Sequence, residues 1–506
     1  MTGATFGPAG RPLRARALAG TLAAVLAAVG LALLVSTKAA NISPAAPLGA
    51  ALFLVLPAWL FVNRRVELSL AVLVVYLGLV DGILKLMTNV EAATLGRDVL
   101  LYAIALGMLA RATLQHRVGR LPPLAGWVIA WTAVVLVQLL NPANGSWLHS
   151  LSSLRQDIEF IPLFFIGYVV MTSVKRLRTF LALLLALAAI NGGVGLVQSG
   201  LSPDQLAGWG PGYAALIEGA DGAPRTSVGA DGEKRVRPPG LGSDMGFGGI
   251  LGAIALPGAL ALLLTRRRGS HATLLCIPLM VLAVIGVISS QSRGTLITAL
   301  VAALAFVGLV VASRQASRVI LSLVATGVLV FVAVTIVTGN DKDALFRYRS
   351  ITPDRIVQTT IDSRSGTFSA IPQYLGEFPL GAGIGSVGPA AGTVGVGTRN
   401  RPSAESQFTY LIAEVGIPGL LVFIAFYGHL LTVVVKRLRR LRQREHQLLL
   451  AGLAAPLFAF VANWIIGVNT VSTPNAPYLW FAAGVLSYWL LTREPRRAEL
   501  AHPGAR

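Results

Sequence analysis

The feature that most constrains this chain is an alternation of apolar runs of about 20 residues with short polar segments. A run of that length crosses a hydrocarbon core of about 30 Å as an α-helix, so each run is a candidate membrane span. The chain has 506 residues, of which 54% are hydrophobic and only 13% are charged. The alternation therefore predicts an all-α polytopic membrane protein and argues against a soluble fold.

The apolar runs predict about fourteen transmembrane helices. In chain order they are 16–36, 44–62, 67–87, 98–114, 124–140, 158–173, 179–198, 244–265, 272–290, 294–312, 319–338, 408–432, 447–467 and 475–492. The first run has a basic front like that of a signal peptide, but it is long for that role, and we interpret it as a span.

The loops between these spans differ in charge. Arginine and lysine cluster in alternate loops, at 11–16, 64–65, 111–120, 175–178, 266–268, 314–318, 436–444 and 493–497. Because basic loops stay in the cytoplasm, the alternation predicts a multi-pass protein of the cytoplasmic (inner) membrane with both termini cytoplasmic. These loops also explain the net charge of +20, so we expect membrane lipids and no nucleic acid as partners.

Two outward loops are long, and loops of that length are usually functional or disordered. They set the expected organisation of the chain. We predict N-terminal transmembrane helices in 1–198, an extracytoplasmic loop in 199–243, further helices in 244–338, a large extracytoplasmic loop in 339–407, three final helices in 408–492 and a cytoplasmic tail in 493–506. We interpret the 339–407 loop as the reaction chamber.

Arginines that break the charge rule are candidates for a binding site. The outward loops carry Arg237, Arg364, Arg399 and Arg401, and Arg293 lies in a tight outward turn between two spans. A guanidinium presents a rigid fork of donors that matches two phosphate oxygens, so such a set suits a pyrophosphate without a metal. The alternatives are solvated loop charges and, for Arg293, a side chain that snorkels outward from the edge of the hydrocarbon.

Two carboxylates lie at the end of the large loop. Glu405 precedes an apolar run, where a low-dielectric wall would raise its pKa and suit it to act as a general base. The alternative is a helix N-cap formed by Ser403 and Glu405. Glu414 lies within the following span, and we expect it to be a buried residue that orders the site through hydrogen bonds.

Two charged clusters have structural explanations. Asp81 and Lys85 are four residues apart near the outer end of one span, close enough to pair. Arg155, Asp157 and Glu159 cluster at the outer end of another. Both sets could instead line one outward cavity, but we favour structural pairing.

Three further sequence patterns give weaker evidence about function. Gly383–Gly388 matches G-x-G-x-x-G, but the prolines around it exclude a βαβ unit, and we interpret it as a flexible or exposed loop that approaches a ligand closely. Cys276 is the single cysteine and no metal-ligand spacing appears, so we expect neither a metal nor a cofactor. Lys436–Gln447 could be an amphipathic helix on anionic lipid, but we favour a topological loop.

Four of these pieces, taken in order, resemble a known family. They are the Ser292-Arg293-Gly294 turn, an arginine in a long outward loop, the stretch Pro379–Gly385, and a helix that opens with Tyr410-Leu411 and continues with Glu414-Val415-Gly416. Together they resemble the bacterial O-antigen ligase and O-antigen (exopolysaccharide) polymerase superfamily. The segment Arg237–Gly240 also resembles an Arg-x-x-Gly pattern of that family.

The resemblance implies a GT-C-like glycosyltransferase of cell-envelope biogenesis. Such an enzyme moves a glycan from a polyprenyl-pyrophosphate carrier, such as undecaprenyl pyrophosphate, to a hydroxyl of a glycan or lipid acceptor at the outer membrane face. A lipid-linked sugar flippase or another transporter is the alternative, and it predicts charges along a central path through the bilayer.

The resemblance also assigns roles to residues. It implies that Arg293 and Arg364 grip the donor pyrophosphate without a metal, and ligases usually have a histidine where this chain has Glu405. A carboxylate can also take a hydroxyl proton, so we expect catalysis by these three residues with inversion at the anomeric carbon. The expected substrate-binding residues are Arg237, Arg399, Arg401 and Glu414.

Overall fold

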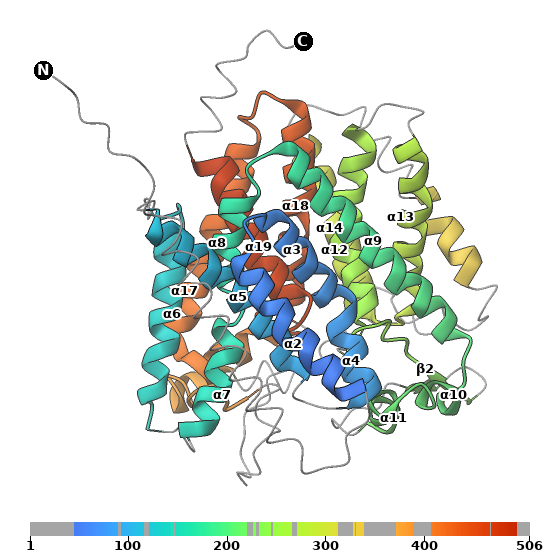
Figure 1. Ribbon diagram of the computed structural model, residues 1–506, viewed down its shortest axis with the longest axis horizontal. Helices are drawn as coiled ribbons and strands as arrows, with labels where there is room; N and C mark the ends of the chain where they lie inside the picture. The colour runs from blue at the N-terminus through green and yellow to red at the C-terminus, as the bar shows by residue number, and fades with distance from the viewer. Residues whose placement is uncertain are drawn as a thin grey trace, which may run out of the picture. The chain divides into compact units, whose positions relative to one another are not determined.

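A computed structural model describes residues 45–89, 93–115, 121–142, 144, 147–219, 226–228, 232–243, 246–265, 271–311, 327–328, 330–337, 371–387, 406–465 and 467–492. These residues form helices and one small two-stranded sheet (Figure 1). Their contacts divide the chain into two compact units, Met1–Val74 with Glu91–Arg120 and Val75–Val90 with Leu121–Arg506. The candidate site residues that are described all belong to the second, larger unit.

The smaller unit pairs α2 (Ala45–Val62) with α5 (Ala93–Leu114), and α3 (Val66–Val75) follows α2 in the chain. Gly107 on α5 lies so close to the backbone of Phe61 that a side chain there would collide with it. Arg111 donates a hydrogen bond to the Phe61 carbonyl oxygen at 2.6 Å. Close approach at a small residue is how helices associate in lipid, where the hydrophobic effect offers little.

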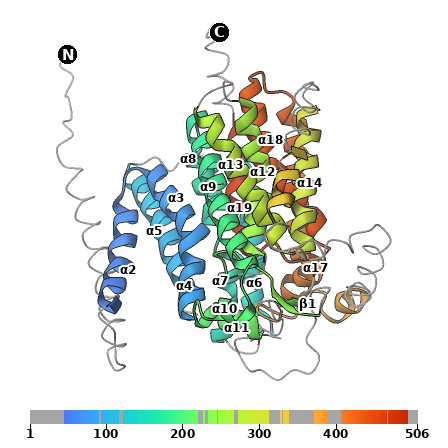
Figure 2. The same cartoon turned by 90° about the vertical axis from the view of Figure 1, so that its right-hand side faces the viewer.

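The larger unit is a bundle of long helices with short helices at one end (Figures 1 and 2). Its helical segments in chain order are the π-helix η1 (Tyr76–Val80), α4 (Asp81–Thr88), α6 (Ala125–Val137), the 3₁₀ turn η2 (Gln138–Leu140), α7 (Trp147–Ile158), α8 (Pro162–Val170), α9 (Val174–Ser199), α10 (Pro203–Ala207), α11 (Pro211–Glu218), α12 (Phe247–Thr265), α13 (His271–Ser289), α14 (Arg293–Val311), α17 (Gln407–Leu438), α18 (Arg444–Asn463) and α19 (Asn475–Leu491). Short helical stretches also lie at 330–337 and 371–377.

Small residues again bring these helices together. Gly192 of α9 lies against the carbonyl of Leu282 on α13, and Gly484 of α19 lies against the carbonyl of Phe164 on α8. A methyl group at either glycine would overlap the facing oxygen. The bundle therefore depends on backbone contacts that only glycine permits.

Among the described residues, 6 helices are long and apolar enough to cross a membrane. They are Val66–Thr88, Val174–Ser199, Phe247–Thr265, Arg293–Val311, Gln407–Leu438 and Arg444–Asn463, with shorter apolar helices at Ala125–Leu140 and Leu274–Ser289. The predicted class, an all-α membrane protein, is confirmed, although the chain adds one small β-hairpin.

One of the expected spans differs from the structure in an informative way. The run at 158–173 is not one helix, because α7 ends at Ile158 and α8 begins at Pro162. Proline fits the first turn of a helix, where its missing N–H is not needed, but it interrupts a helix that would pass through it. The run at 16–36 lies outside the described residues, and that at 319–338 is described only in part.

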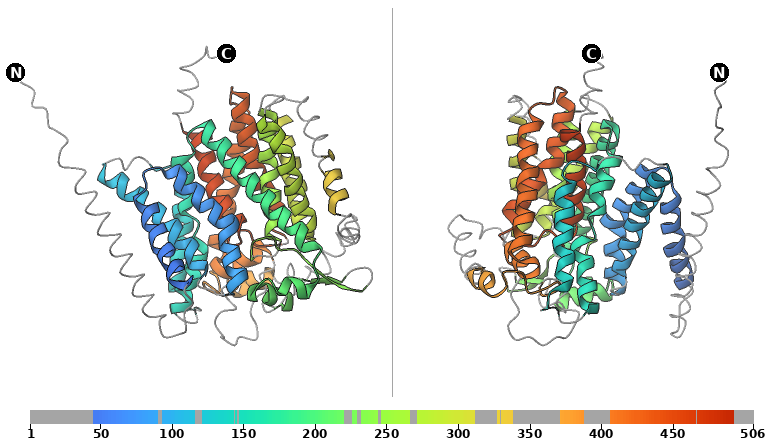
Figure 3. Two further views of the ribbon diagram at one scale, coloured as in Figure 1. Left: turned by 45° about the vertical axis from the view of Figure 1, so that its right-hand side comes forward. Right: turned by 90° about the vertical axis from the view of Figure 1, so that its left-hand side faces the viewer.

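The described part of the 199–243 loop is folded rather than extended. It contains α10, α11 and an antiparallel hairpin of β1 (Thr226–Val228) and β2 (Lys234–Val236), with Thr226 opposite Val236. A small core anchors these elements on α4, and its members are Leu86, Leu206, Tyr213, Leu216 and Val236. The loop thus forms a capping layer at the same end of the bundle as residues 371–387 (Figure 3).

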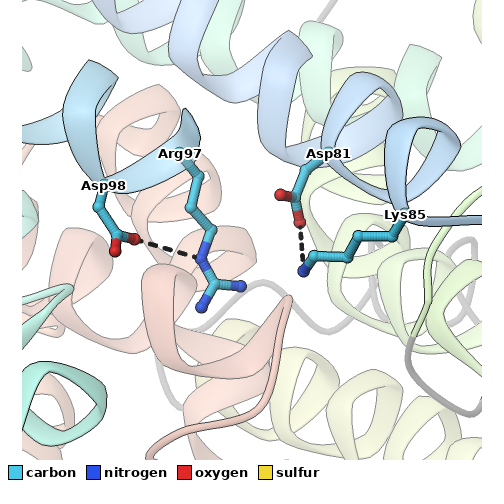
Figure 4. A network of polar contacts seen from close by, with 4 residues as sticks. All are labelled: Asp81, Lys85, Arg97 and Asp98. Atoms are coloured by element: carbon cyan, nitrogen blue, oxygen red, sulfur yellow. Dashed lines mark hydrogen bonds and ion pairs between the residues drawn. The ribbon is translucent and has the colours of Figure 1, made fainter. Parts of the chain in front are cut away.

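Each unit contains an ion pair between near neighbours in the chain (Figure 4). On α4, Lys85 Nζ lies 2.9 Å from Asp81 Oδ2, which confirms the predicted pairing. In the smaller unit, Arg97 Nε lies 3.5 Å from Asp98 Oδ1.

The basic segment at 436–447 forms no separate helix. Residue 438 is the last of α17, residues 439–443 form a turn, and α18 begins at Arg444. The structure therefore agrees with a connecting loop and not with an amphipathic helix on the membrane surface.

Candidate functional site

The glycine-rich segment at 379–387 is bound to the first turns of α17. The N–H of Gly385 donates to Glu414 Oε2 at 2.6 Å, and the N–H of Val387 donates to Oε1 at 2.9 Å. Glu414 is 1% exposed, and both oxygens of its carboxylate accept hydrogen bonds from this segment. A second set of bonds joins the N–H of Ala382 and the hydroxyl of Ser386 to the Ala413 carbonyl, at 2.6 and 3.3 Å.

The same segment packs against a break in α17. Gly416 has φ 67° and ψ −168°, which interrupts the helix, and the next N–H, that of Ile417, donates to the Pro379 carbonyl at 2.9 Å. Gly381 has φ 92°, and a methyl group there would lie 3.0 Å from the Gly416 nitrogen. Positive φ costs little only for glycine. The stretches Pro379–Gly385 and Glu414–Gly416 are therefore two sides of one contact.

This arrangement corrects one expectation. The G-x-G-x-x-G segment was expected to be a flexible or exposed loop, but Gly381, Gly383 and Gly385 are buried where they are described. Their close backbone approach is to protein, because a side chain at Gly383 would collide with Asn144. The glycines serve packing against α17 and its neighbours.

Three amides that no motif in the sequence marks lie along the other side of this segment, and two of them bond to it. Gln138 Nε2 donates to the Leu380 carbonyl at 2.6 Å, and Asn141 Nδ2 donates to the Gly381 carbonyl at 2.9 Å. Asn144 bonds back to η2, with Nδ2 2.8 Å from the Gln138 carbonyl. The only local signal is their spacing of three residues at the end of an apolar run.

The start of α17 is fixed by its own cap. Ser406 Oγ accepts the N–H of Thr409 at 3.1 Å, and Thr409 Oγ1 accepts the N–H of Ser406 at 3.2 Å. The buried Gln407 ties this turn to the end of α18, since its N–H donates to the Trp464 carbonyl at 2.9 Å. The N-cap is thus Ser406, so the capping hydrogen bond does not need Glu405, which is outside the described residues.

A buried carboxyl joins α7 to the same helix. The hydroxyl of Tyr410 donates to Asp157 Oδ1 at 2.9 Å, and Asp157 is 4% exposed. Burial raises the pKa of Asp157 to about 7, and the hydrogen bond from Tyr410 partly opposes this. The second oxygen, Oδ2, is buried without a hydrogen-bond partner in the described part of the chain. Burial of an oxygen without a hydrogen-bond partner costs less for a neutral, protonated carboxyl than for a charged carboxylate.

The Ser292-Arg293-Gly294 turn lies between α13 and α14. Gln291 has φ 48°, Ser290 Oγ donates to the Val287 carbonyl at 2.8 Å, and Ser292 Oγ accepts the N–H of Thr295 at 3.3 Å. Arg293 is the first residue of α14, and its Nε is buried with no partner among the residues described. A guanidinium at a helix N-terminus gives this turn a local positive potential suited to an anion.

The stem that carries Arg237 is held by two buried amides of α9. Gln198 forms a pair of 2.9 Å hydrogen bonds with the peptide N–H and C=O of Gly240, and the N–H of Leu241 donates to Asn191 Oδ1 at 2.9 Å. Asn191 Nδ2 donates in turn to the Gly78 carbonyl of η1 at 3.0 Å. Both amide side chains are fully buried, so the stem has one position relative to α9.

The first turn of α12 connects this stem to the Ser-Arg-Gly turn. The N–H of Gly248 donates to the Pro239 carbonyl at 3.2 Å, and a methyl group at Gly249 would lie 2.7 Å from Ser290 Oγ. The structure therefore places the Arg237 and Arg293 segments on either side of one helix end. Glu405, Arg364, Arg399 and Arg401 lie outside the described ranges, so their positions stay predictions.

The described residues contain no group of three or more His, Cys, Asp or Glu side chains that could hold a metal ion. What they bring together is a cationic turn, a helix N-terminus and a stem that ends in arginine. These groups can bind and stabilise an oxyanion.

Comparison with known protein families identifies the segment that contains this turn. Residues 278–424 match the family model described as O-antigen ligase. The match includes Arg293, the glycine-rich segment and Glu414, whereas Arg237 lies before it. It confirms the predicted resemblance and the predicted enzyme class, a glycosyltransferase-type ligase. No curated protein matches the chain.

Proposed function

We propose, from the O-antigen ligase match over residues 278–424, that this membrane protein transfers a glycan from a polyprenyl-pyrophosphate carrier to an acceptor hydroxyl. The acceptor is a lipid, as for an O-antigen ligase, or a second glycan, as for a surface-polysaccharide polymerase. The reaction takes place at the outer face of the cytoplasmic membrane. The observation that carries the proposal is Arg293 at the N-terminus of α14, whose guanidinium Nε is buried and has no partner in the described part of the chain.

In this mechanism the arginines stabilise the leaving group. Negative charge develops on the pyrophosphate as its bond to the anomeric carbon breaks, and fixed donors aimed at that charge lower the barrier most. Arg293 and Arg364 contact the pyrophosphate, and Arg237, Arg399 and Arg401 support them. These groups carry out the stabilisation that a metal supplies elsewhere, so the reaction is metal-independent.

The proton of the acceptor passes to Glu405. The acceptor oxygen forms a bond to the anomeric carbon while the carbon–oxygen bond to pyrophosphate breaks, and the bonding electrons leave with the polyprenyl pyrophosphate. One displacement of this kind inverts the anomeric configuration. Support comes from the cap at Ser406, which fixes the backbone next to Glu405 and makes the capping bonds itself.

The proposed topology has about fourteen spans in a GT-C-like arrangement, two long extracytoplasmic loops and cytoplasmic termini. Its support is the separation of charge along the larger unit. Arg178 at the start of α9 pairs with Glu445 at the start of α18, at 2.6 Å between Nη2 and Oε1. The arginine-rich helix ends thus meet at one end of the bundle, and the capping layer lies at the other.

The test measures glycan transfer by the full-length protein in membranes. With a polyprenyl-pyrophosphate-linked glycan as donor, Arg293→Ala should reduce transfer by about 100-fold or more, the usual effect of losing one oxyanion donor. Arg439→Ala, at an exposed arginine of the opposite helix ends, is the matched control and should transfer at the wild-type rate. Comparing lipid and glycan acceptors separates ligase from polymerase.

Two results would overturn the proposal. One is wild-type transfer by correctly inserted Arg293→Ala protein. The other is movement of the intact lipid-linked glycan across the bilayer without transfer, which is the behaviour of a flippase.

A further inference from the structure

One buried hydroxyl beside Arg293 makes no hydrogen bond within the described part of the fold. Thr295 is 2% exposed, and its Oγ1 is buried and has no partner among those residues. Burying a hydroxyl without a partner destabilises a fold. A native fold keeps such a group only for a reason, and an absent ligand is one.

The hydroxyls around Thr295 are all used by the backbone. Ser290 Oγ donates to the Val287 carbonyl at 2.8 Å, and Ser292 Oγ accepts the N–H of Thr295 itself. Thr298, almost one turn further along α14 and 1% exposed, donates to the Gly294 carbonyl at 2.8 Å. Thr295 and Thr298 therefore share a residue type, a helix and a degree of burial, and they differ in whether the hydroxyl has a partner.

The hydroxyl of Thr295 faces a glycine instead of a side chain. Gly246, just before α12, has φ 70°, and a methyl group there would lie 3.3 Å from Thr295 Oγ1 and 3.5 Å from Ser292 Cβ. The neighbour of Oγ1 at this point, where α12 and α14 both begin, therefore offers no side-chain polar group to pair with it. The same helix end carries Arg293, whose Nε also lacks a partner among the described residues.

We propose that Thr295 is a binding residue for the diphosphate of the lipid-linked donor, with its hydroxyl donating a hydrogen bond to a phosphate oxygen beside the Arg293 guanidinium. The inference rests on the proposed function and adds a neutral donor to the arginines. A hydroxyl and a guanidinium Nε that both lack partners among the described residues, at a helix N-terminus with its partial positive charge, form a set suited to a doubly charged oxyanion.

The test measures binding of polyprenyl diphosphate without a glycan to the full-length protein in lipid nanodiscs, by titration with a fluorescent analogue. Thr295→Val keeps the shape of the side chain and removes the hydroxyl, and it should weaken binding about tenfold. Thr295→Ser keeps the hydroxyl and should bind within about threefold of wild type. Thr298→Val removes the paired hydroxyl and should bind as wild type does.

The outcomes separate this inference from the proposed function. If the wild-type protein does not bind polyprenyl diphosphate, the proposed function fails, and the role of Thr295 fails with it. If Arg293→Ala weakens binding but Thr295→Val does not, the inference about Thr295 alone is wrong. Equal weakening by Thr295→Val and Thr298→Val also overturns it, because the cause is then the packing of α14.

Discussion

The glycine-rich segment at 379–387 and the turn at 290–295 are both short segments at one end of the larger unit. They differ in whether their buried polar groups find hydrogen-bond partners among the described residues. The first is held from two sides, by the carboxylate of Glu414 and by the amides of Gln138 and Asn141. Beside it, Asn144 Oδ1 lies against Gly383 and is buried without a partner among the described residues. The second leaves Arg293 Nε and Thr295 Oγ1 buried without partners among the residues described.

We interpret the paired segment at 379–387 as part of the scaffold and the turn at 290–295 as a binding surface. A segment whose polar groups are paired within the protein loses stability when a partner is removed, because a buried group is left unsatisfied. A segment whose buried polar groups are unpaired is already less stable by that desolvation cost. Removing such a group should therefore weaken ligand binding more than it lowers the stability of the fold. The Arg293 and Thr295 variants test the second statement, and Glu414→Ala tests the first.

The largest effect on stability is expected from Glu414→Ala. It removes the carboxylate that accepts the N–H groups of Gly385 and Val387, at about 1–3 kcal/mol for each hydrogen bond lost, so the free energy of unfolding should fall by about 3 kcal/mol or more. Thermal unfolding of the detergent-solubilised protein measures this loss. Glu377→Ala, at an exposed acid of the same loop, should change stability by less than about 0.5 kcal/mol.

Arg293→Ala provides the contrast in the same assay. Since Nε has no partner to lose among the described residues, the variant should unfold close to the wild-type temperature although its transfer activity is lost. If Arg293→Ala were as unstable as Glu414→Ala, the distinction between the two segments would be wrong.

An intermediate effect is expected from Gly416→Ala. The backbone at Gly416 has φ 67°, and a side chain there would collide with the Leu380 backbone, so the break in α17 and its contact with 379–387 cannot both persist. A loss of about 1–3 kcal/mol follows from the conformation alone. Gly428→Ala, on the same helix with open space around it, is the control and should be neutral or slightly stabilising. Equal stability of the two variants would contradict the proposed contact.

The smallest effect is a pH dependence that arises at Asp157. Its pKa in the folded protein is about 7, above the ordinary value, so between about pH 4 and pH 7 the folded state binds a proton that the unfolded state does not. Stability should therefore fall as pH rises through this window, by at most about 1.4 kcal/mol per pH unit. Asp157→Asn keeps the acceptor for Tyr410 and should flatten the profile. An unchanged slope in this variant would remove Asp157 as the cause.

Local chemistry was enough to predict much of this protein. Apolar runs of sufficient length gave helices whose observed ends lie close to the expected ones, as for 475–492 and α19. The pair Asp81 and Lys85 follows from the spacing of one helical turn. The order of short motifs suggested a family that the match over residues 278–424 supports.

Contacts between distant parts of the chain could not be predicted in this way. Gln138 bonds to the Leu380 carbonyl, Tyr410 bonds to Asp157, and Gln198 holds the peptide of Gly240. No periodicity in a single sequence encodes which distant segment supplies a hydrogen-bond partner, so the sequence does not predict these contacts. For the same reason, the sequence pattern favours an exposed glycine-rich segment where the structure has a buried one.

The sequence by itself determined that this is an all-α membrane protein and where most of the described helices lie, because length and hydropathy are properties of short stretches. The tertiary structure alone decided which polar groups find a partner. A hydrogen bond needs two atoms within about 3 Å, and only the packed bundle fixes that distance for residues hundreds of positions apart. That is why only the folded chain distinguishes Glu414, whose two oxygens both accept hydrogen bonds, from Thr295, whose hydroxyl has no partner among the described residues.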